Sequence, residues 1–95
     1  MADKNPALKK FALGPVQMIL LSIQQYKNAN HGRYPKRIEL HPVVMQDFRK
    51  TLRNEYPQYA QDEVARGSFL GVPIIQNPNA DRPRLITHEG KIEYL

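Results

Sequence analysis

The chain has 95 residues, a formal net charge of +5 at pH 7 and no cysteine. Its length supports one domain with a modest core, because so short a chain buries only about 60 to 65% of the surface that its unfolded form exposes. The absence of cysteine excludes a disulfide framework and a thiolate zinc site, so stability must come from packing or from self-association.

The positive charge is concentrated in the first half of the chain. Residues 1–53 contain ten Lys and Arg against three Asp and Glu, whereas residues 54–95 contain four against six. This asymmetry suits a face that meets an acidic partner, either a nucleic acid or an acidic protein surface. The alternative is that these side chains only solvate the outer sides of two helices.

Prolines indicate where the first two helices begin. Asn5 and Pro6 are typical of a helix start, so residues 1–14 are expected to form a short helix or an ordered arm. Pro15 opens a longer helix that should end near Gly32, with this glycine in the left-handed conformation. Apolar residues recur along the longer helix at helical spacing and form one face: Val16, Ile19, Leu20, Ile23 and Tyr26.

A short strand and an amphipathic helix are expected next. Residues 37–41 alternate between apolar and polar side chains, with Ile38 and Leu40 against Glu39, which predicts a half-buried strand. Pro42 then stands at the start of a helix whose two sides differ in polarity. The apolar side has Val44, Met45, Phe48 and Leu52, and the opposite side has Gln46, Arg49, Lys50 and Arg53.

The next segment predicts a weak helix and a strand that contains proline. Residues 57–67 favour a short helix with Gly67 as its terminator. Residues 68–76 are rich in β-forming side chains, but Pro73 cannot donate to a strand ladder. This strand should therefore lie at a sheet edge or carry a bulge beside Gly71.

The last two strands are expected to form a hairpin. Residues 77–83 have the composition of a loop, and residues 84–87 and 91–95 favour strands on either side of a turn in which Gly90 can take a positive φ. The predicted fold class is therefore α+β. Residues 15–95 should form a single small domain with two to four helices packed on a small, mainly antiparallel sheet.

The sequence contains no catalytic, metal or cofactor signature. His31, His41 and His88 lack the helical spacing of a metal site and are expected to be structural or at the surface. Asp62 and Glu63 are adjacent, which on a helix points their carboxylates about 100° apart and disfavours paired acid-base chemistry. The two serines lie outside any nucleophile-elbow pattern. We therefore expect no enzyme activity, no cofactor and no metal.

One pattern does indicate binding, namely a basic cluster with one aromatic residue among its members. Its cationic groups are suited to several phosphates or to an acidic protein surface. It lacks a helix-turn-helix pair, and one aromatic ring is too few for a base-stacking platform. The candidate partner-binding residues are Arg33, Tyr34, Lys36, Arg37, Arg49, Lys50 and Arg53.

The middle of the chain also resembles a known family. A helix that ends at Gly32 is followed by YPKRIELHP (34–42), a helix through MQDFRKTL (45–52) and the segment FLGVPIIQN (69–77). This order, over about residues 16–77, resembles the later part of tailed-bacteriophage major capsid proteins. In that family a helix leads to an apolar-x-apolar-x-Pro strand, a second helix and a Gly-x-Pro-apolar strand. The resemblance implies a phage-derived miniature that keeps this module without the arm and long loop that build a shell.

Two functional hypotheses follow. The first, which depends on the resemblance, is a small non-enzymatic phage-type protein that binds a protein partner, as a virion accessory or on a host factor. The alternative is a nucleic-acid-binding accessory protein that uses the basic face of residues 33–53. The longest apolar run is too short for a membrane span, and the first residues do not read as a secretory signal. We expect no membrane partner and a cytoplasmic location, or a virion if the chain is phage-encoded.

Self-association is expected through the last strand. Residues 91–95 have no protecting proline, and only Lys91 and Glu93 are charged. A second copy can cover such an edge by two-fold pairing. We therefore expect a homodimer or a higher homo-oligomer in which these residues are buried.

Overall fold

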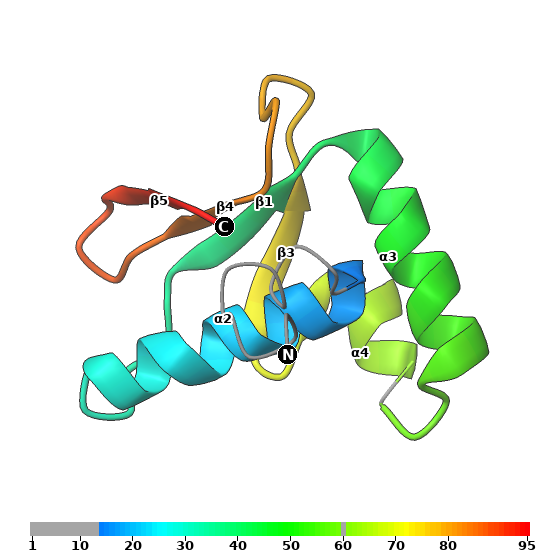
Figure 1. The fold of residues 1–95 in the computed structure, drawn as a ribbon, viewed down its shortest axis with the longest axis horizontal. Coiled ribbons are helices and arrows are strands. Elements are labelled where there is room, and N and C mark those ends of the chain that lie inside the picture. Colours follow the sequence, from blue (N-terminus) through cyan, green and yellow to red (C-terminus); the bar gives the residue numbers. More distant parts are fainter. Residues whose placement is uncertain (1–13, 60) are drawn as a thin grey trace, which may run out of the picture.

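The protein's structure, a computed structural model, describes residues 14–59 and 61–95. Its elements along the chain are α2 (Pro15–Ala29), β1 (Arg37–Leu40), α3 (Pro42–Glu55), α4 (Gln61–Ala65), β2 (Ser68–Phe69), β3 (Val72–Gln76), β4 (Arg84–Ile86) and β5 (Ile92–Tyr94) (Figure 1). This arrangement confirms the predicted α+β class. The short helix or arm expected before Gly14 lies outside the described residues.

The strands form a five-stranded sheet in the order β2-β3-β1-β4-β5. β1 runs parallel to β3, and the other three neighbouring pairs are antiparallel, so the sheet is mainly antiparallel as predicted. The parallel pair requires a crossover between the end of β1 and the start of β3, and the segment with α3, α4 and β2 provides it. β2 and β5 are the two edge strands.

The ends of the two long helices form as the local sequence predicts. Both begin with proline, whose missing N–H is not needed in a first helical turn. His41 caps α3, because its Nδ1 accepts a hydrogen bond from the N–H of Val43 at 3.2 Å. α2 ends at Ala29, and Gly32 has a φ of 82° and donates its N–H to the carbonyl of Lys27 at 2.7 Å.

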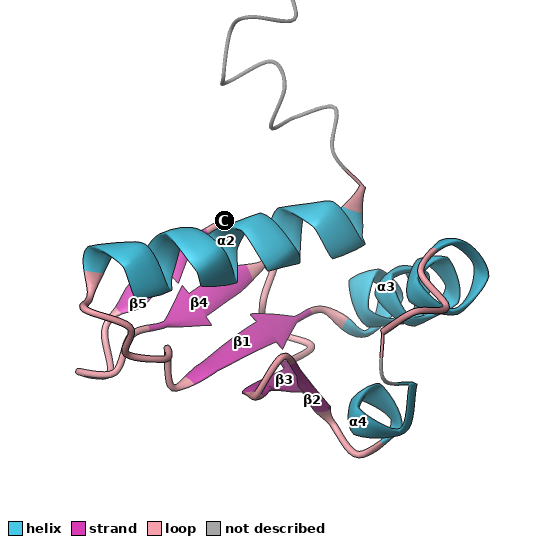
Figure 2. Cartoon of the chain, turned by 90° about the horizontal axis from the view of Figure 1, so that it is seen from below, coloured by secondary structure: helices cyan, strands magenta, loops and turns pink. Residues whose placement is uncertain are grey.

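The hydrophobic core lies between α2 and one face of the sheet, with α3 packed against α2 beside it (Figure 2). Phe48 of α3 and Phe69 of β2 meet edge to face, with ring centroids 5.4 Å apart. The apolar sides predicted for both helices face this core, with Leu20 and Val44 at its margin. The largest fully buried side chains are Phe48, Phe69, Ile19, Ile23, Ile38, Leu40, Met45, Leu52 and Leu85.

The single strand predicted over residues 68–76 is wrong, because this segment forms a hairpin. β2 and β3 pair about Leu70 and Gly71, whose φ values are 54° and 82°. Two successive positive φ values are typical of a tight two-residue hairpin turn. Pro73 lies in an inner strand and not at an edge. It is tolerated there because it precedes Ile74, the first residue of β3 that pairs with β1.

The C-terminal hairpin forms as predicted. β4 and β5 are antiparallel, and Gly90 in the turn between them has a φ of 89°. The helix predicted over residues 57–67 is limited to the five residues of α4, and Gly67 follows it with a φ of 95°. Short-range signals from glycine therefore located the ends of these elements correctly.

Candidate functional site

One face of the sheet lacks a covering helix within the described residues (Figure 2). Successive side chains of a strand point to opposite faces, so the residues that alternate with the core positions share this second face. The register places Ile75 beside Glu39, Glu39 beside Arg84, and Arg84 beside Tyr94. We call this side of the sheet the open face, and it consists of Arg37, Glu39, Pro73, Ile75, Arg84, Ile86, Ile92 and Tyr94, of which Glu39 and Ile86 are buried.

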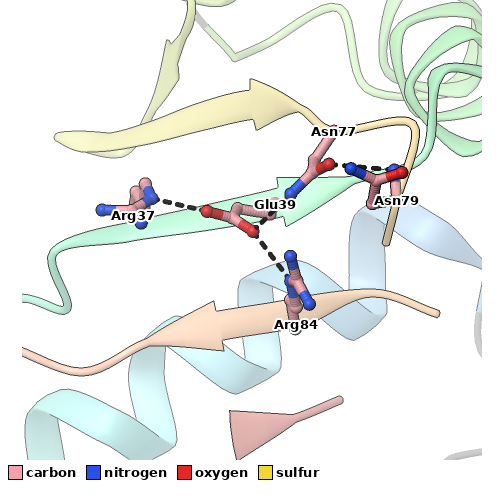
Figure 3. Close-up of polar contacts among 5 residues, drawn as sticks. All are labelled: Arg37, Glu39, Asn77, Asn79 and Arg84. Atoms are coloured by element: carbon pink, nitrogen blue, oxygen red, sulfur yellow. Dashed lines mark hydrogen bonds and ion pairs between the residues drawn. The ribbon is translucent and has the colours of Figure 1, made fainter. Parts of the chain in front are cut away.

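Glu39, at the centre of the open face, is held by three other side chains (Figure 3). Its Oε2 accepts a hydrogen bond from Nε of Arg37 at 2.7 Å, and its Oε1 accepts one from Nε of Arg84 at 2.7 Å. The amide Nδ2 of Asn77 donates to Oε1 at 3.0 Å, and Oδ1 of Asn77 accepts from the N–H of Asn79 at 2.9 Å. We call Arg37, Glu39, Asn77 and Arg84 the ionic cluster.

The ionic cluster keeps the Glu39 carboxylate charged. The hydrogen bond from Arg37 is the largest cause that lowers the pKa of Glu39 from 4.5 to about 2, and Asn77 and Arg84 act in the same direction against the effect of burial. Both carboxylate oxygens already accept hydrogen bonds, so Glu39 is poorly placed to act as a general base.

The burial of Glu39 corrects the prediction of a half-buried strand. Its side chain is only 9% exposed, although it lies on the face that no described helix covers. The side chains of Arg37 and Arg84 flank it on either side (Figure 3). Arg84 is 45 residues away in the sequence, so the alternation of apolar and polar residues in β1 gives no sign of this cover.

Exposed apolar side chains border the ionic cluster. Ile75 is 43% exposed on β3, and Ile92 and Tyr94 are 50% and 53% exposed on β5. The guanidinium of Arg82 lies 5.0 Å from the ring centroid of Tyr94, within reach of a cation–π contact. None of these residues is among the partner-binding residues predicted from the sequence. A weak signal for Ile92 and Tyr94 is present in the sequence, because these apolar residues alternate with the charged Glu93 along the last strand.

The seven residues of the predicted basic cluster fall into two groups. Four precede or open β1, and three lie on the exposed side of α3, which begins at the opposite end of β1 (Figure 1). The first group is Arg33, Tyr34, Lys36 and Arg37, and the second is Arg49, Lys50 and Arg53. The structure therefore does not gather them into one continuous surface.

The two groups also differ in their contacts. Arg37 belongs to the ionic cluster, and Tyr34 packs against Gly71 while Nζ of Lys27 lies 4.5 Å from the centroid of its ring. The three basic residues of α3 are exposed and make no ion pair with another described residue. Within the described part of the chain, these three positive charges therefore stay unpaired.

Two of the three histidines make structural contacts, as expected. His41 caps α3, and His88 is hydrogen bonded to Tyr26, whereas His31 is exposed just after α2. In residues 14–59 and 61–95, no three His, Asp or Glu side chains are grouped so that they could hold a metal ion. In the same ranges, no helix has both the length and the apolar character needed to cross a membrane.

Comparisons of the chain with protein-family models, with curated proteins and with solved structures found no significant match.

Proposed function

We propose that this chain is a non-enzymatic protein-interaction module that binds an acidic and partly apolar protein surface through its open face. The observation that carries the proposal is the exposure of Ile75, Ile92 and Tyr94 around the ionic cluster, on a sheet face that no described helix covers. Exposed apolar side chains that lie beside polar groups on one surface are typical of protein interaction sites.

The charge of the open face favours an acidic partner. Arg37, Arg82 and Arg84 lie on or beside this face, and Glu39 is the one carboxylate among the residues that define it. Arg37 and Arg84 use their Nε–H groups on Glu39, and a guanidinium has five N–H donors in all. The remaining donors can bind carboxylates of a partner in fork geometry.

The ionic cluster also reduces the reorganisation that binding requires. Glu39 and Asn77 hold Arg84 in place before any partner arrives, so less side-chain entropy is lost on association. A rigid polar centre with apolar residues at its sides suits a partner surface of matching shape.

Capture experiments with matched variants test this proposal. The immobilised wild-type chain is compared with Ile75→Ser/Tyr94→Ser and with Val43→Ser, in which a 66% exposed residue outside the sheet is changed. We expect a specific protein to be retained by the wild type and by Val43→Ser and to be lost with the double variant. Retention by all three would contradict a role for the open face, provided that circular dichroism shows that each variant is folded.

The resemblance of residues 16–77 to phage capsid proteins stays a prediction about this chain. A phage-type role requires the captured protein to be a virion component or a host factor. Mass spectrometry of the captured protein, followed by a binding titration with the purified partner, distinguishes these two cases. A partner that is neither would remove the phage-type part of the proposal and leave the interaction module in place.

A nucleic-acid-binding function is the second candidate, and the exposed side of α3 favours it. Arg49, Lys50 and Arg53 lie together there and make no ion pair with another described residue. Binding to phosphates would weaken steeply as the salt concentration rises. If this candidate holds, the triple change of these residues to Glu should abolish retention on DNA or RNA, whereas Ile75→Ser/Tyr94→Ser should leave it unchanged.

A further inference from the structure

β5 is an edge of the sheet that no other described strand or helix covers. It lies at the end of the strand order, and its three residues are exposed. The other edge strand, β2, is only two residues long and packs against α4. An unprotected edge strand offers unpaired backbone groups to another chain.

The hydrogen bonds of the β4–β5 hairpin identify these free backbone groups. Thr87 donates its N–H to the carbonyl of Lys91 at 2.8 Å, and Leu95 donates to Pro83 at 3.0 Å. In an antiparallel pair, the backbone N–H and C=O groups of successive residues point alternately toward the paired strand and away from it. The N–H and C=O groups of Ile92 and Tyr94 therefore point to the outer side of β5.

Self-pairing of β5 meets an electrostatic obstacle. If two copies pair about a two-fold axis so that both outward residues of each copy form hydrogen bonds, Glu93 lies directly opposite the Glu93 of the second copy. Like charges in this position are destabilising. Shifting the pairing register by two residues in either direction separates the two carboxylates. It also removes half of the hydrogen bonds between the copies, because either Ile92 or Tyr94 then has no residue opposite it in the second copy's strand.

The surroundings of Glu93 favour a basic side chain at the opposite position. Glu93 is aligned with the core residue Leu85, so it lies on the face of β5 toward α2. There it borders a hollow of about 220 Å³ that Gln25 and Asn30 of the α2 region also line. The hollow is smaller than the pockets of about 300 to 1,000 Å³ that take drug-sized ligands, which suits it to one long side chain. Glu93 makes no ion pair with another described residue.

We infer that β5 is a docking site for an extended segment of another protein, which adds to the sheet as a further strand. The segment places Lys or Arg opposite Glu93, in the hollow beside α2, and apolar residues beside Ile92 and Tyr94. The backbone N–H and C=O of Glu93 point toward β4 and not toward the added strand. Glu93 and the residue opposite it therefore form a non-hydrogen-bonded pair, in which opposite side chains approach most closely. This inference extends beyond the open face to the backbone edge and the opposite face of β5.

Synthetic peptides test the inference directly. Three fluorescent peptides are titrated into the full chain at physiological salt. In the first, valine alternates with lysine; in the second, valine alternates with glutamate; and in the third, proline alternates with lysine. The net charge of +5 favours the glutamate peptide non-specifically, so a preference for the valine–lysine peptide must come from a local acidic site. We expect that preference, no binding of the proline peptide, and slower exchange of the Ile92 and Tyr94 amides.

Two pairs of variants separate the charge and backbone contributions. Glu93→Lys should change the ratio of the lysine-peptide and glutamate-peptide affinities by about tenfold, whereas Glu89→Lys, an equal charge change in the turn, should not. Ile92→Pro removes only an outward N–H and should abolish binding, whereas Ile92→Ala should only weaken it. Unchanged exchange of the Thr87 amide verifies that the hairpin is intact.

Three results would overturn this inference. The first is a peptide preference that Glu93→Lys and Glu89→Lys alter equally. The second is binding that protects amides outside β5. The third is light scattering that reports a dimer of the free chain with the Ile92 and Tyr94 amides already protected, because a second copy would then occupy the edge. Ile75 lies in β3, away from this edge, so loss of partner capture by Ile75→Ser alone would be independent of all three.

Discussion

The hydroxyl of Tyr26 accepts a hydrogen bond from the backbone N–H of His88 at 2.8 Å and also contacts Nδ1 of the same histidine. Tyr26 lies in the last turn of α2, and His88 lies in the turn between β4 and β5. The two rings meet edge to face with centroids 5.9 Å apart. This contact, between residues 62 positions apart, connects the covering helix to the C-terminal hairpin.

We expect Tyr26→Phe to destabilise the protein by about 1 kcal/mol, because it leaves the N–H of His88 without its acceptor in a partly buried position. For a domain of this size, that loss lowers the melting temperature by about 4 to 8 °C. Tyr34→Phe is the matched control, since the Tyr34 hydroxyl is exposed and makes only a long contact of 3.4 Å with Lys27. Equal melting temperatures for the two variants would show that the Tyr26 contact adds no stability.

Phe48→Ala should destabilise the protein by about 3 to 5 kcal/mol, because it opens a cavity at a fully buried ring that packs on Phe69. Natural domains are stable by only about 5 to 15 kcal/mol, so this variant should be near the limit of folding. The change in urea midpoint measures the effect. Val43→Ala, at an exposed site of the same helix, should shift the midpoint little. A midpoint of Phe48→Ala like that of the wild type would refute the packing described above.

Glu39 should make stability depend on pH in the acid range. Its pKa is lowered from 4.5 to about 2 in the folded protein, so its contribution is complete above pH 4.5 and is lost as the pH falls toward 2. Glu39→Gln cannot titrate and leaves Arg37 and Arg84 without their counterion. We expect the wild type to be the more stable protein at pH 7 and the difference to shrink between pH 4.5 and pH 2.

Urea unfolding of both proteins across this pH range measures that difference, and the other carboxyl groups titrate in both and largely cancel. A stability difference that does not change with pH would mean that the folded and unfolded states bind the Glu39 proton equally well.

Glu63 should stabilise the tight turn between β2 and β3. Its Oε1 accepts a hydrogen bond from the N–H of Leu70 at 2.8 Å, and its Oε2 accepts one from Gly71 at 3.1 Å. We expect Glu63→Gln to cost about 1 to 2 kcal/mol, because the amide has only one acceptor atom. Asp62→Asn changes the exposed neighbouring carboxylate and serves as the control. If both variants unfold at the same urea concentration, the carboxylate of Glu63 does not support the turn.

Local signals in the sequence predicted most of the elements. Proline at the start of α2 and α3 and glycine at positions 32, 67 and 90 act through the φ angles that these residues favour or permit, and this effect needs no distant contact. The helical spacing of Phe48 and Leu52 likewise predicted which side of α3 is buried. These features depend only on near neighbours in the chain.

The turn at Leu70 shows where local signals fail. Leucine rarely takes a positive φ, so the glycine at position 71 alone did not predict the hairpin between β2 and β3. The Glu63 carboxylate, seven residues earlier, binds the N–H groups of the turn. In the sequence, Glu63 was considered only as one of two adjacent acids that are unsuited to catalysis. Its hydrogen-bond partners could not be predicted, because they come within reach only when α4 packs beside β2.

The sequence by itself determined the α+β class, the order of the elements apart from the β2–β3 hairpin, and the buried sides of α2 and α3, because each follows from periodicity and backbone preference over a few residues. Only the tertiary structure decided which surface is available for binding. Strand pairing brings Arg84 to Glu39 and aligns Tyr94 with Arg84, and the crossover through α3 places the two basic groups at opposite ends of β1. These relationships depend on register between distant strands, which single-strand patterns do not encode.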